Sequence, residues 1–308
     1  MVDTIGASEK IFGERKPSTL REIYKARWPY LFISPFYILF LIFGLYPVVF
    51  SFYLSFTDWK GLGPIKSVGL NNFILLFQDQ VFLQSIYNGV ILFFMYVPIM
   101  TLLALVLAVI LNSKRIRGFR FFRTILFIPY IMNIVAAGFS FRLLLEQKYG
   151  LVNVVLTYLN IPPVPWLESM WGGRVSLCLL VIWAWLGYNM VIMLAGLQTI
   201  PNELNEAAMV DGASPTQAFF HITIPLMRPV ILFSVVLSTM GSFYLFNEVS
   251  ILTRGGPMNA TITPIIDIFN QAFNNFRLGY ASAMAYIYFI IIFFLTLIQV
   301  RYFGKRVD

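Results

Sequence analysis

Between Asp79 and Lys114 the chain reads QVFLQSIYNGVILFFMYVPIMTLLALVLAVILNS (residues 80–113), without one acidic, basic or histidine side chain. An α-helix needs about 20 mostly apolar residues to cross the hydrocarbon layer of a bilayer. This stretch exceeds that length, and lipid offers no partner to backbone groups that a helix leaves unpaired. It therefore predicts a membrane-spanning helix.

Comparable runs lie on both sides of this segment. Of the 308 residues, 59% are hydrophobic and 12% are charged, which is about half the charge that soluble domains usually carry. The other long uncharged runs cover residues 28–57, 124–141, 175–202, 229–247 and 278–300. Together with segment 80–113 they predict an all-α, polytopic membrane protein with about six transmembrane helices.

One more uncharged run, 149–167, differs from these six. It contains Pro162, Pro163 and Pro165, and each proline removes a backbone donor that lipid cannot replace. We expect a loop or a helix on the membrane surface there.

The distribution of lysine and arginine predicts the orientation. With six spans both termini lie on one side, and that side collects 15 of the 22 basic residues. The positive-inside rule makes this side cytoplasmic. We expect a cytoplasmic N-terminal lead over residues 1–27, a six-span domain over 28–303 and a cytoplasmic tail over 304–308. The lead is long and polar and no small-residue cleavage site follows run 28–57, so this run is a retained span rather than a signal peptide.

Several function classes lack their sequence signals. Ion-coupled carriers generally place ionisable groups inside the membrane, and here only Glu248 comes close, at the outer end of run 229–247. No P-loop, H-E-x-x-H or G-x-S-x-G string occurs, so neither a P-loop ATP site nor a hydrolase centre is recognisable. The basic residues flank spans, which argues against nucleic-acid binding. The single His221 excludes a multi-histidine metal site, and the single Cys178 is interpreted as a packing residue. We expect a non-catalytic transport protein without a metal or cofactor of its own.

The connection between the fourth and fifth spans reads QTIPNELNEAAMVDGASPTQAFFHITIPLMRP (residues 198–229). One helix is expected to begin at Asn202 and to end at Gly212, because glycine adopts the left-handed conformation that terminates helices. A second is expected to begin after Ser214, which forms a capping box with Gln217. The segment predicts two short helices joined by a tight elbow on the cytoplasmic face.

Pro225 and Pro229 are expected to close this segment before the fifth span. The whole ordered string resembles the EAA loop of binding-protein-dependent ABC importer permeases. The matching residues are Glu206, Ala207, Ala208, Asp211, Gly212, Ala213, Phe219, Ile222 and Pro225. Ile224 stands where the family often has leucine, a minor change. The resemblance implies that the loop docks in a groove of a cytoplasmic ATPase subunit, with the two alanines allowing close approach.

A second motif, LTRGGPMNAT at residues 252–261, precedes Gly279-Tyr-Ala-Ser-Ala283. Both are similar to maltose-type carbohydrate importer permeases, and the resemblance implies a type I ABC importer permease fold. Here the first external connection, about 58–79, is short, so the chain lacks the large external domain of some maltose permeases.

The resemblance also implies partners. These are a second, homologous permease subunit, a dimer of cytoplasmic ATP-binding subunits, an extracytoplasmic solute-binding protein and the lipid bilayer. ATP and Mg²⁺ would bind the ATPase subunit, and the implied location is the cytoplasmic (inner) membrane with both termini cytoplasmic.

The solute is interpreted as a neutral sugar or oligosaccharide, because no lysine or arginine lies within an uncharged run and sugars offer apolar faces to aromatic rings. Candidates for lining its path are Trp183, Trp185, Tyr188, Asn189, Ser242, Tyr244, Asn247 and Glu248; each aromatic one is also explained as an interfacial anchor. Alternatives remain open: the same architecture for a phosphorylated polyol or a polyamine, a stand-alone ion-coupled carrier or channel, and, more distantly, a membrane-embedded enzyme.

Overall fold

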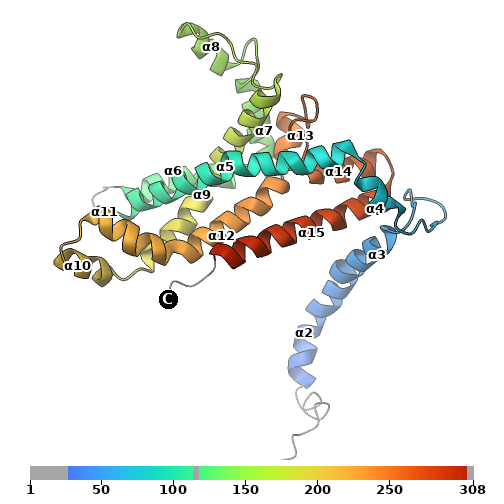
Figure 1. The fold of residues 1–308 in the computed structure, drawn as a ribbon, viewed down its shortest axis with the longest axis horizontal. Helices are drawn as coiled ribbons and strands as arrows, with labels where there is room; N and C mark the ends of the chain where they lie inside the picture. Colours follow the sequence, from blue (N-terminus) through green and yellow to red (C-terminus); the bar gives the residue numbers. More distant parts are fainter. Residues whose placement is uncertain (1–26, 114–117, 304–308) are drawn as a thin grey trace, which may run out of the picture. The chain divides into compact units, whose positions relative to one another are not determined.

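The computed structural model describes residues 27–113 and 118–303 (Figure 1). The predicted N-terminal lead before Arg27, the tail 304–308 and residues 114–117 lie outside the described residues. Contacts divide the chain between Ser51 and Phe52 into two units, and each unit is described by itself.

The first unit holds most of one apolar helical segment. It consists of α2 (Arg27–Phe40), the π-turn η1 (Leu41–Leu45) and α3 (Tyr46–Leu54), whose last residues cross the unit boundary. Its apolar side chains are mostly exposed, for example Phe32 at 81% and Phe43 at 75%. An apolar helix with no buried side chain from Trp28 to Tyr53 fits a lipid environment, in agreement with the predicted first span.

The second unit contains the remaining helices. In chain order they are α4 (Asn71–Leu76), α5 (Gln80–Asn112), α6 (Phe119–Ile131), α7 (Ile134–Leu144), α8 (Leu151–Tyr158), α9 (Met170–Gln198), α10 (Asn202–Val210), α11 (Pro215–Ala218), η2 (Phe219–Thr223), α12 (Ile224–Phe243), α13 (Asn247–Leu252), α14 (Pro264–Phe269), η3 (Asn270–Asn274) and α15 (Leu278–Phe303). Helices α5, α12 and α15 run side by side (Figure 1).

Helices α5 and α9 form the centre of this unit, and α12 packs against both. Their contact buries Leu92 and Met100 of α5 with Leu177 and Leu180 of α9. Cys178 lies in the same cluster, which confirms its prediction as a packing residue. The first turn of α5 is capped by Asp79, whose Oδ1 accepts hydrogen bonds from the Val81 and Phe82 amides at 2.9 and 3.2 Å.

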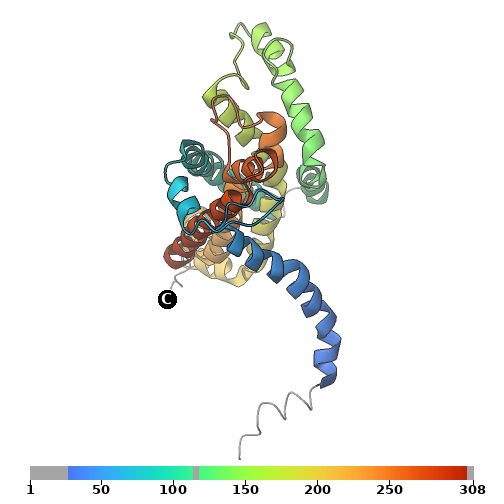
Figure 2. The ribbon, with the colours of Figure 1, turned by 90° about the vertical axis from the view of Figure 1, so that its right-hand side faces the viewer.

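The described chain has five helices long and apolar enough to cross a membrane, or six if a bent pair is counted as one span. The prediction of about six spans is confirmed in this sense. The span predicted over 124–141 is a bent pair of helices, because α6 and α7 meet at an angle of 93°. Asn133 causes the break: its side chain caps α7 by accepting from the Val135 and Ala136 amides. Both views place α8 at one end of this unit and the C-terminal end of α15 toward the other (Figures 1 and 2).

The fifth span differs from its prediction at both ends. Pro225 and Pro229 do not close the preceding segment, because α11, η2 and α12 form one continuous helix from Pro215 to Phe243. Pro225 sits in the first turn of α12, after a π-turn, where its missing donor leaves no gap in the helix. Outward, the helix stops at Phe243 and the chain is irregular over 244–246, so the predicted run to residue 247 is too long.

Candidate functional site

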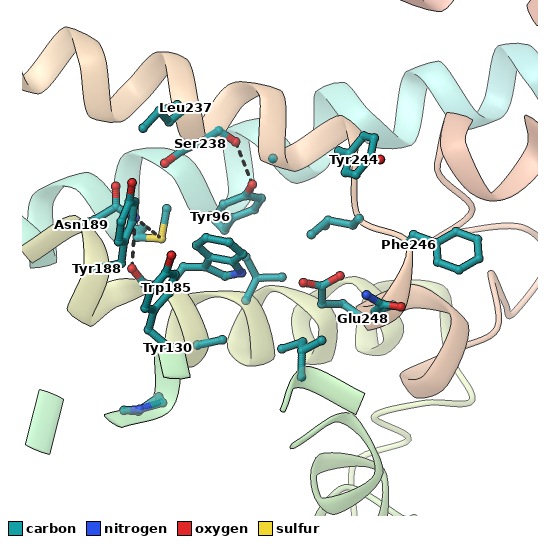
Figure 3. Close-up of a pocket in the computed structure, with 18 of the residues that line it drawn as sticks. Tyr96, Tyr130, Trp185, Tyr188, Asn189, Leu237, Ser238, Tyr244, Phe246 and Glu248 are labelled. Carbon is teal, nitrogen blue, oxygen red and sulfur yellow. Dashed lines mark hydrogen bonds between the residues drawn. The ribbon is translucent and has the colours of Figure 1, made fainter. Parts of the chain in front are cut away.

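A cavity of about 720 Å³ opens among α5, α6, α9, the end of α12 and the start of α13 (Figure 3). Such a volume matches pockets for small organic ligands. The lining residues are Tyr96, Met100, Pro129, Tyr130, Met132, Ile134, Val181, Ala184, Trp185, Tyr188, Asn189, Leu237, Ser238, Gly241, Tyr244, Leu245, Phe246, Asn247 and Glu248.

Three aromatic rings form a shelf in this cavity, called the aromatic shelf below. Tyr130 of α6 stacks on Tyr188 of α9, with ring centroids 4.7 Å apart and planes 19° apart. Trp185 meets Tyr130 edge to face at 5.3 Å. The three rings cluster in Figure 3. Flat apolar ring faces of this kind match the apolar faces of a sugar ring.

The close approach of α6 to α9 brings the shelf together. A Cβ atom at Gly187 would clash with the carbonyl group of Leu126, so only glycine fits there. Because Leu126 lies one turn before Tyr130, this contact fixes the distance between the two tyrosines.

Polar groups surround the shelf. The Asn189 amide donates to the Trp185 carbonyl at 3.0 Å and accepts from the Ser234 hydroxyl at 2.6 Å. The Tyr96 hydroxyl donates to the Ser238 carbonyl at 2.9 Å. Glu248, 7% exposed, directs its carboxyl group toward the Trp185 indole (Figure 3). The cavity therefore combines apolar faces with a few fixed hydrogen-bonding groups.

No lysine, arginine or histidine is among the described residues that line the cavity. Among these described lining residues, Glu248 alone carries a carboxyl group. Within the described part of the chain, no group of three or more His, Cys, Asp and Glu side chains is placed to hold a metal ion.

Six of the eight residues predicted to line a solute path border this cavity: Trp185, Tyr188, Asn189, Tyr244, Asn247 and Glu248. Trp183 lies instead against Phe141, with ring centroids 5.3 Å apart. Ser242 is buried and donates to the Thr239 carbonyl at 2.7 Å.

Sequence reasoning missed several lining residues. Tyr96 lies within the long run 80–113, and nothing in the pattern separates it from other buried positions. Tyr130 follows Pro129 directly, and a proline within an apolar run was the one signal for a special site there. Phe246 and Ser238 were also missed.

The predicted coupling loop has the expected form at its elbow. Gly212 adopts a left-handed conformation, with φ +85°. Ser214 and Gln217 form the predicted capping box, with hydrogen bonds of 3.3 and 2.8 Å.

The exposed surface of this loop is mixed in character. Glu206, Ala207, Asp211 and Gly212 are exposed, whereas Ala208, Ala213, Phe219, Ile222 and Pro225 are half-buried. Val210 and Phe220 add exposed apolar surface, at 87% and 60%. Apolar surface beside small residues and carboxylates is typical of a protein contact.

The family model described as "binding-protein-dependent transport system inner membrane component" matches residues 73–308. The chain belongs to this family. A lactose transport system permease protein of Rhizobium radiobacter is 36% identical over 287 residues, covering 92% of this chain and 95% of the relative. An arabinooligosaccharides transport system permease protein of Bacillus subtilis is 33% identical, covering 94% and 93%.

The fold is that of an ABC transporter permease. A crystal structure of a bacterial ABC transporter involved in the import of the acidic polysaccharide alginate matches with a TM-score of 0.81 and 22% identity, covering 94% of this permease and 99% of that chain. The permease is thus a multi-pass membrane component of a binding-protein-dependent transport system.

Proposed function

We propose that this permease subunit imports a neutral sugar or oligosaccharide. The observation that carries the proposal is the cavity itself, in which the aromatic shelf lies beside Asn189, Asn247 and Glu248 and no described lining residue is cationic. Aromatic faces and amide groups suit a polyol, whereas an anionic solute would find no counter-charge among the described residues that line the cavity. The sugar-transporting relatives support the same choice.

The proposed assembly contains a second, homologous permease subunit, two cytoplasmic ATP-binding subunits and an extracytoplasmic solute-binding protein. ATP and Mg²⁺ bind the ATPase subunits, and this chain catalyses nothing itself. The complex lies in the cytoplasmic membrane with both termini of this chain in the cytoplasm. The exposed face of the coupling loop around Glu206 and Val210 supports the docking of an ATPase subunit there.

A second candidate solute is a polyamine. Glu248 would supply a carboxylate for an ammonium group, and the aromatic shelf would supply cation–π contacts. A phosphorylated polyol has less support, because the described lining offers it no cation.

The first experiment is a pull-down of this chain from detergent-solubilised native membranes, with the co-purifying subunits identified by mass spectrometry. A second permease and a P-loop ATPase are expected. Recovery of this chain alone, under conditions that preserve other membrane complexes, would overturn the importer and favour a stand-alone carrier or channel.

The second experiment measures the solute. The complex is reconstituted in proteoliposomes with its binding protein, and uptake of labelled lactose is competed with other neutral oligosaccharides, spermidine and glycerol phosphate. Competition by neutral sugars alone is expected. Competition by spermidine alone would identify a polyamine as the transported solute.

A further inference from the structure

The chain is irregular over residues 244–246, between the end of α12 and the start of α13, and we call this segment the break. All three of its residues line the cavity, as do Asn247 and Glu248, which follow directly (Figure 3). At the depth of a membrane, irregular backbone is tolerated only where its polar groups find partners within the protein. The partners of the break therefore decide how this wall of the cavity is placed.

Two contacts from a later part of the chain hold the break. The Thr263 hydroxyl donates to the Leu245 carbonyl at 2.7 Å, and both residues are buried. The Phe269 ring of α14 meets the Phe246 ring edge to face, with centroids 5.1 Å apart. A continuous helix would satisfy such a carbonyl with its own backbone amide four residues later, and here a side-chain hydroxyl does so.

Thr263 ends the segment between α13 and α14, residues 253–263, which we call the support loop. The Thr253 and Thr261 hydroxyls are 2.7 Å apart, and the Thr261 hydroxyl donates to the Gly256 carbonyl at 3.0 Å. Thr261 and Thr263 are fully buried. These hydrogen bonds fix the shape of the support loop but not its position against the long helices.

Side chains from two of those helices fix the position of the support loop. Asn88 of α5 donates from Nδ2 to the carbonyls of Asn259 and Ile262 at 2.7 and 2.9 Å. Arg174 of α9 donates from Nε to the Ala260 carbonyl and from a terminal nitrogen to Asn88 Oδ1, both at 3.0 Å. We call Asn88 and Arg174 the clamp.

The burial of Arg174 makes the clamp specific for one position of the loop. Arg174 is 4% exposed, and its guanidinium lies over the Trp171 ring, 5.0 Å from the centroid. None of the partners named here, the Trp171 ring, the Ala260 carbonyl and the Asn88 side chain, carries a negative charge. A buried cation costs stability, and more so when its donors are left unsatisfied. Displacement of the support loop would leave Arg174 without its carbonyl partner, so the arginine stabilises the loop in this place.

The clamp also relates the break to the rest of the cavity. Helix α5 carries Asn88 and the lining residue Tyr96, and α9 carries Arg174 and the shelf residues Trp185 and Tyr188. A continuous series of hydrogen bonds thus leads from α5 and α9 through the support loop to the break.

We propose that Asn88, Arg174 and Thr263 are positioning residues for the bound sugar: the clamp holds the support loop, and Thr263 of this loop holds the break, so that Asn247 and Glu248 keep a fixed place relative to the aromatic shelf. The inference rests on the proposed function, and its three residues lie outside the cavity lining. Sugars differ in the directions of their hydroxyl groups, so a site selects among them only when its hydrogen-bonding groups and ring faces are held rigidly together.

The first test changes one hydroxyl group. Thr263→Val replaces it with a methyl group of similar size, and amide hydrogen exchange of residues 244–250 is measured by mass spectrometry on the whole complex in nanodiscs. Exchange there is expected to become about fivefold faster, because the break opens more often without this hydrogen bond. Thr263→Ser keeps the hydroxyl and is expected to exchange like the wild type.

A matched control removes another buried hydroxyl. Ser85 is fully buried and donates to the Phe82 carbonyl at 2.7 Å, so its hydrogen bond stays within the α5 segment. Ser85→Ala is expected to leave the exchange of residues 244–250 unchanged. Equal exchange of this segment in Thr263→Val and the wild type would overturn the positioning role.

The second readout is the uptake of labelled lactose per ATP hydrolysed, by complexes in proteoliposomes with the binding protein, and other labelled neutral oligosaccharides are measured in parallel. Thr263→Val is expected to lower this ratio about fivefold at an unchanged rate of ATP hydrolysis, because it loosens the cavity wall and leaves the coupling loop intact. Thr263→Ser is expected to restore the ratio. A loss of uptake and ATP hydrolysis in equal proportion would indicate general damage and would overturn the inference.

The clamp is tested with Arg174. Arg174→Met removes both donors and is expected to change exchange and uptake per ATP as Thr263→Val does, whereas Arg174→Lys keeps a cationic donor and recovers part of both. An assembled Arg174→Met complex that behaves like the wild type would overturn the role of the clamp. Where Arg174→Met fails to assemble, Thr263→Val decides.

The two proposals fail in different ways. Wild-type complexes that take up spermidine and no neutral oligosaccharide would overturn the proposed solute. Unchanged exchange and unchanged uptake per ATP in Thr263→Val, in complexes whose wild type transports a neutral sugar, would overturn the positioning role alone.

Discussion

The ring of Tyr130 lies on the ring of Tyr188, with centroids 4.7 Å apart. The two residues belong to α6 and α9, which are separated in the chain by α7 and α8. The pair defines one wall of the cavity and depends on the contact between Leu126 and Gly187. The shape of the cavity wall therefore depends on the packing of α6 against α9.

Removal of one ring tests the aromatic shelf. Tyr188→Ala is expected to lower sugar uptake by reconstituted complexes about 2- to 10-fold, because a stacking contact contributes about 0.5–1.5 kcal/mol. Tyr188→Phe keeps the ring and is expected to retain most uptake. If both variants transport like the wild type, the shelf does not bind the solute.

Gly187→Ala tests the helix contact behind the shelf. Its Cβ would meet the Leu126 carbonyl, so α6 must shift and carry Tyr130 away from Tyr188. Overpacking of this kind costs about 1–3 kcal/mol, and thermal unfolding in detergent should fall to a lower temperature together with sugar uptake.

The matched control lies on the same helix. Gly173→Ala adds a Cβ whose nearest neighbours are at 3.4 Å or beyond, an ordinary contact. Its unfolding temperature should stay close to that of the wild type. An equal loss in the two variants would mean that α9 tolerates no added methyl group, and the specific contact with Leu126 would lose its support.

Sequence periodicity accounts for part of the predicted solute path. Trp185, Tyr188 and Asn189 are spaced by three and four residues and so share one face of α9, and all three line the cavity. Trp183 is two residues from Trp185, about 200° around the helix, and accordingly faces Phe141. The spacing would have excluded Trp183 before the structure was known.

Other features required the tertiary structure. Tyr130 reaches the cavity only because α6 bends away at Asn133 and packs closely on Gly187, and neither event follows from hydropathy. Arg174 ended the predicted uncharged run, yet α9 begins four residues earlier and buries it. A hydropathy window treats such an arginine as a boundary, whereas its hydrogen bonds to the Ala260 carbonyl and to Asn88 Oδ1 make burial possible.

The two-helix form of this loop was predicted from local capping and turn chemistry, whereas its coupling role was implied by the family resemblance and is tested at the elbow. Gly212→Pro is expected to abolish ATP-driven uptake while membrane insertion persists, because proline fixes φ near −65° and cannot adopt the left-handed conformation seen there. Gly212→Asn is the control, since asparagine tolerates this conformation.

Glu206→Lys tests the exposed face of the same loop. It reverses an exposed charge on α10 without burying anything, so the chain should fold normally and lose coupling to the ATPase. The readout is uptake per assembled complex, with subunit stoichiometry measured in parallel. Normal uptake by assembled complexes carrying Glu206→Lys or Gly212→Pro would contradict the coupling role.

Asp267 predicts a pH dependence of the stability of this protein. Burial, followed by the nearby Asp79 carboxylate, raises the pKa of Asp267 to about 6, and one of its carboxyl oxygens has no hydrogen-bond partner. The folded state thus binds this proton more tightly than the unfolded chain, whose aspartate pKa is about 3.9. The stabilising contribution is fully present below about pH 4 and is lost as the pH rises to about 6 and above, for a total of roughly 3 kcal/mol. Asp267→Asn removes the titrating group, so its unfolding temperature should exceed that of the wild type at pH 7.5 and the difference should shrink toward pH 4.

The exposed Asp58→Asn is the control and should follow the wild type across this range. A wild-type protein and an Asp267→Asn variant with parallel profiles from pH 4 to 7.5 would show that Asp267 does not titrate in this window.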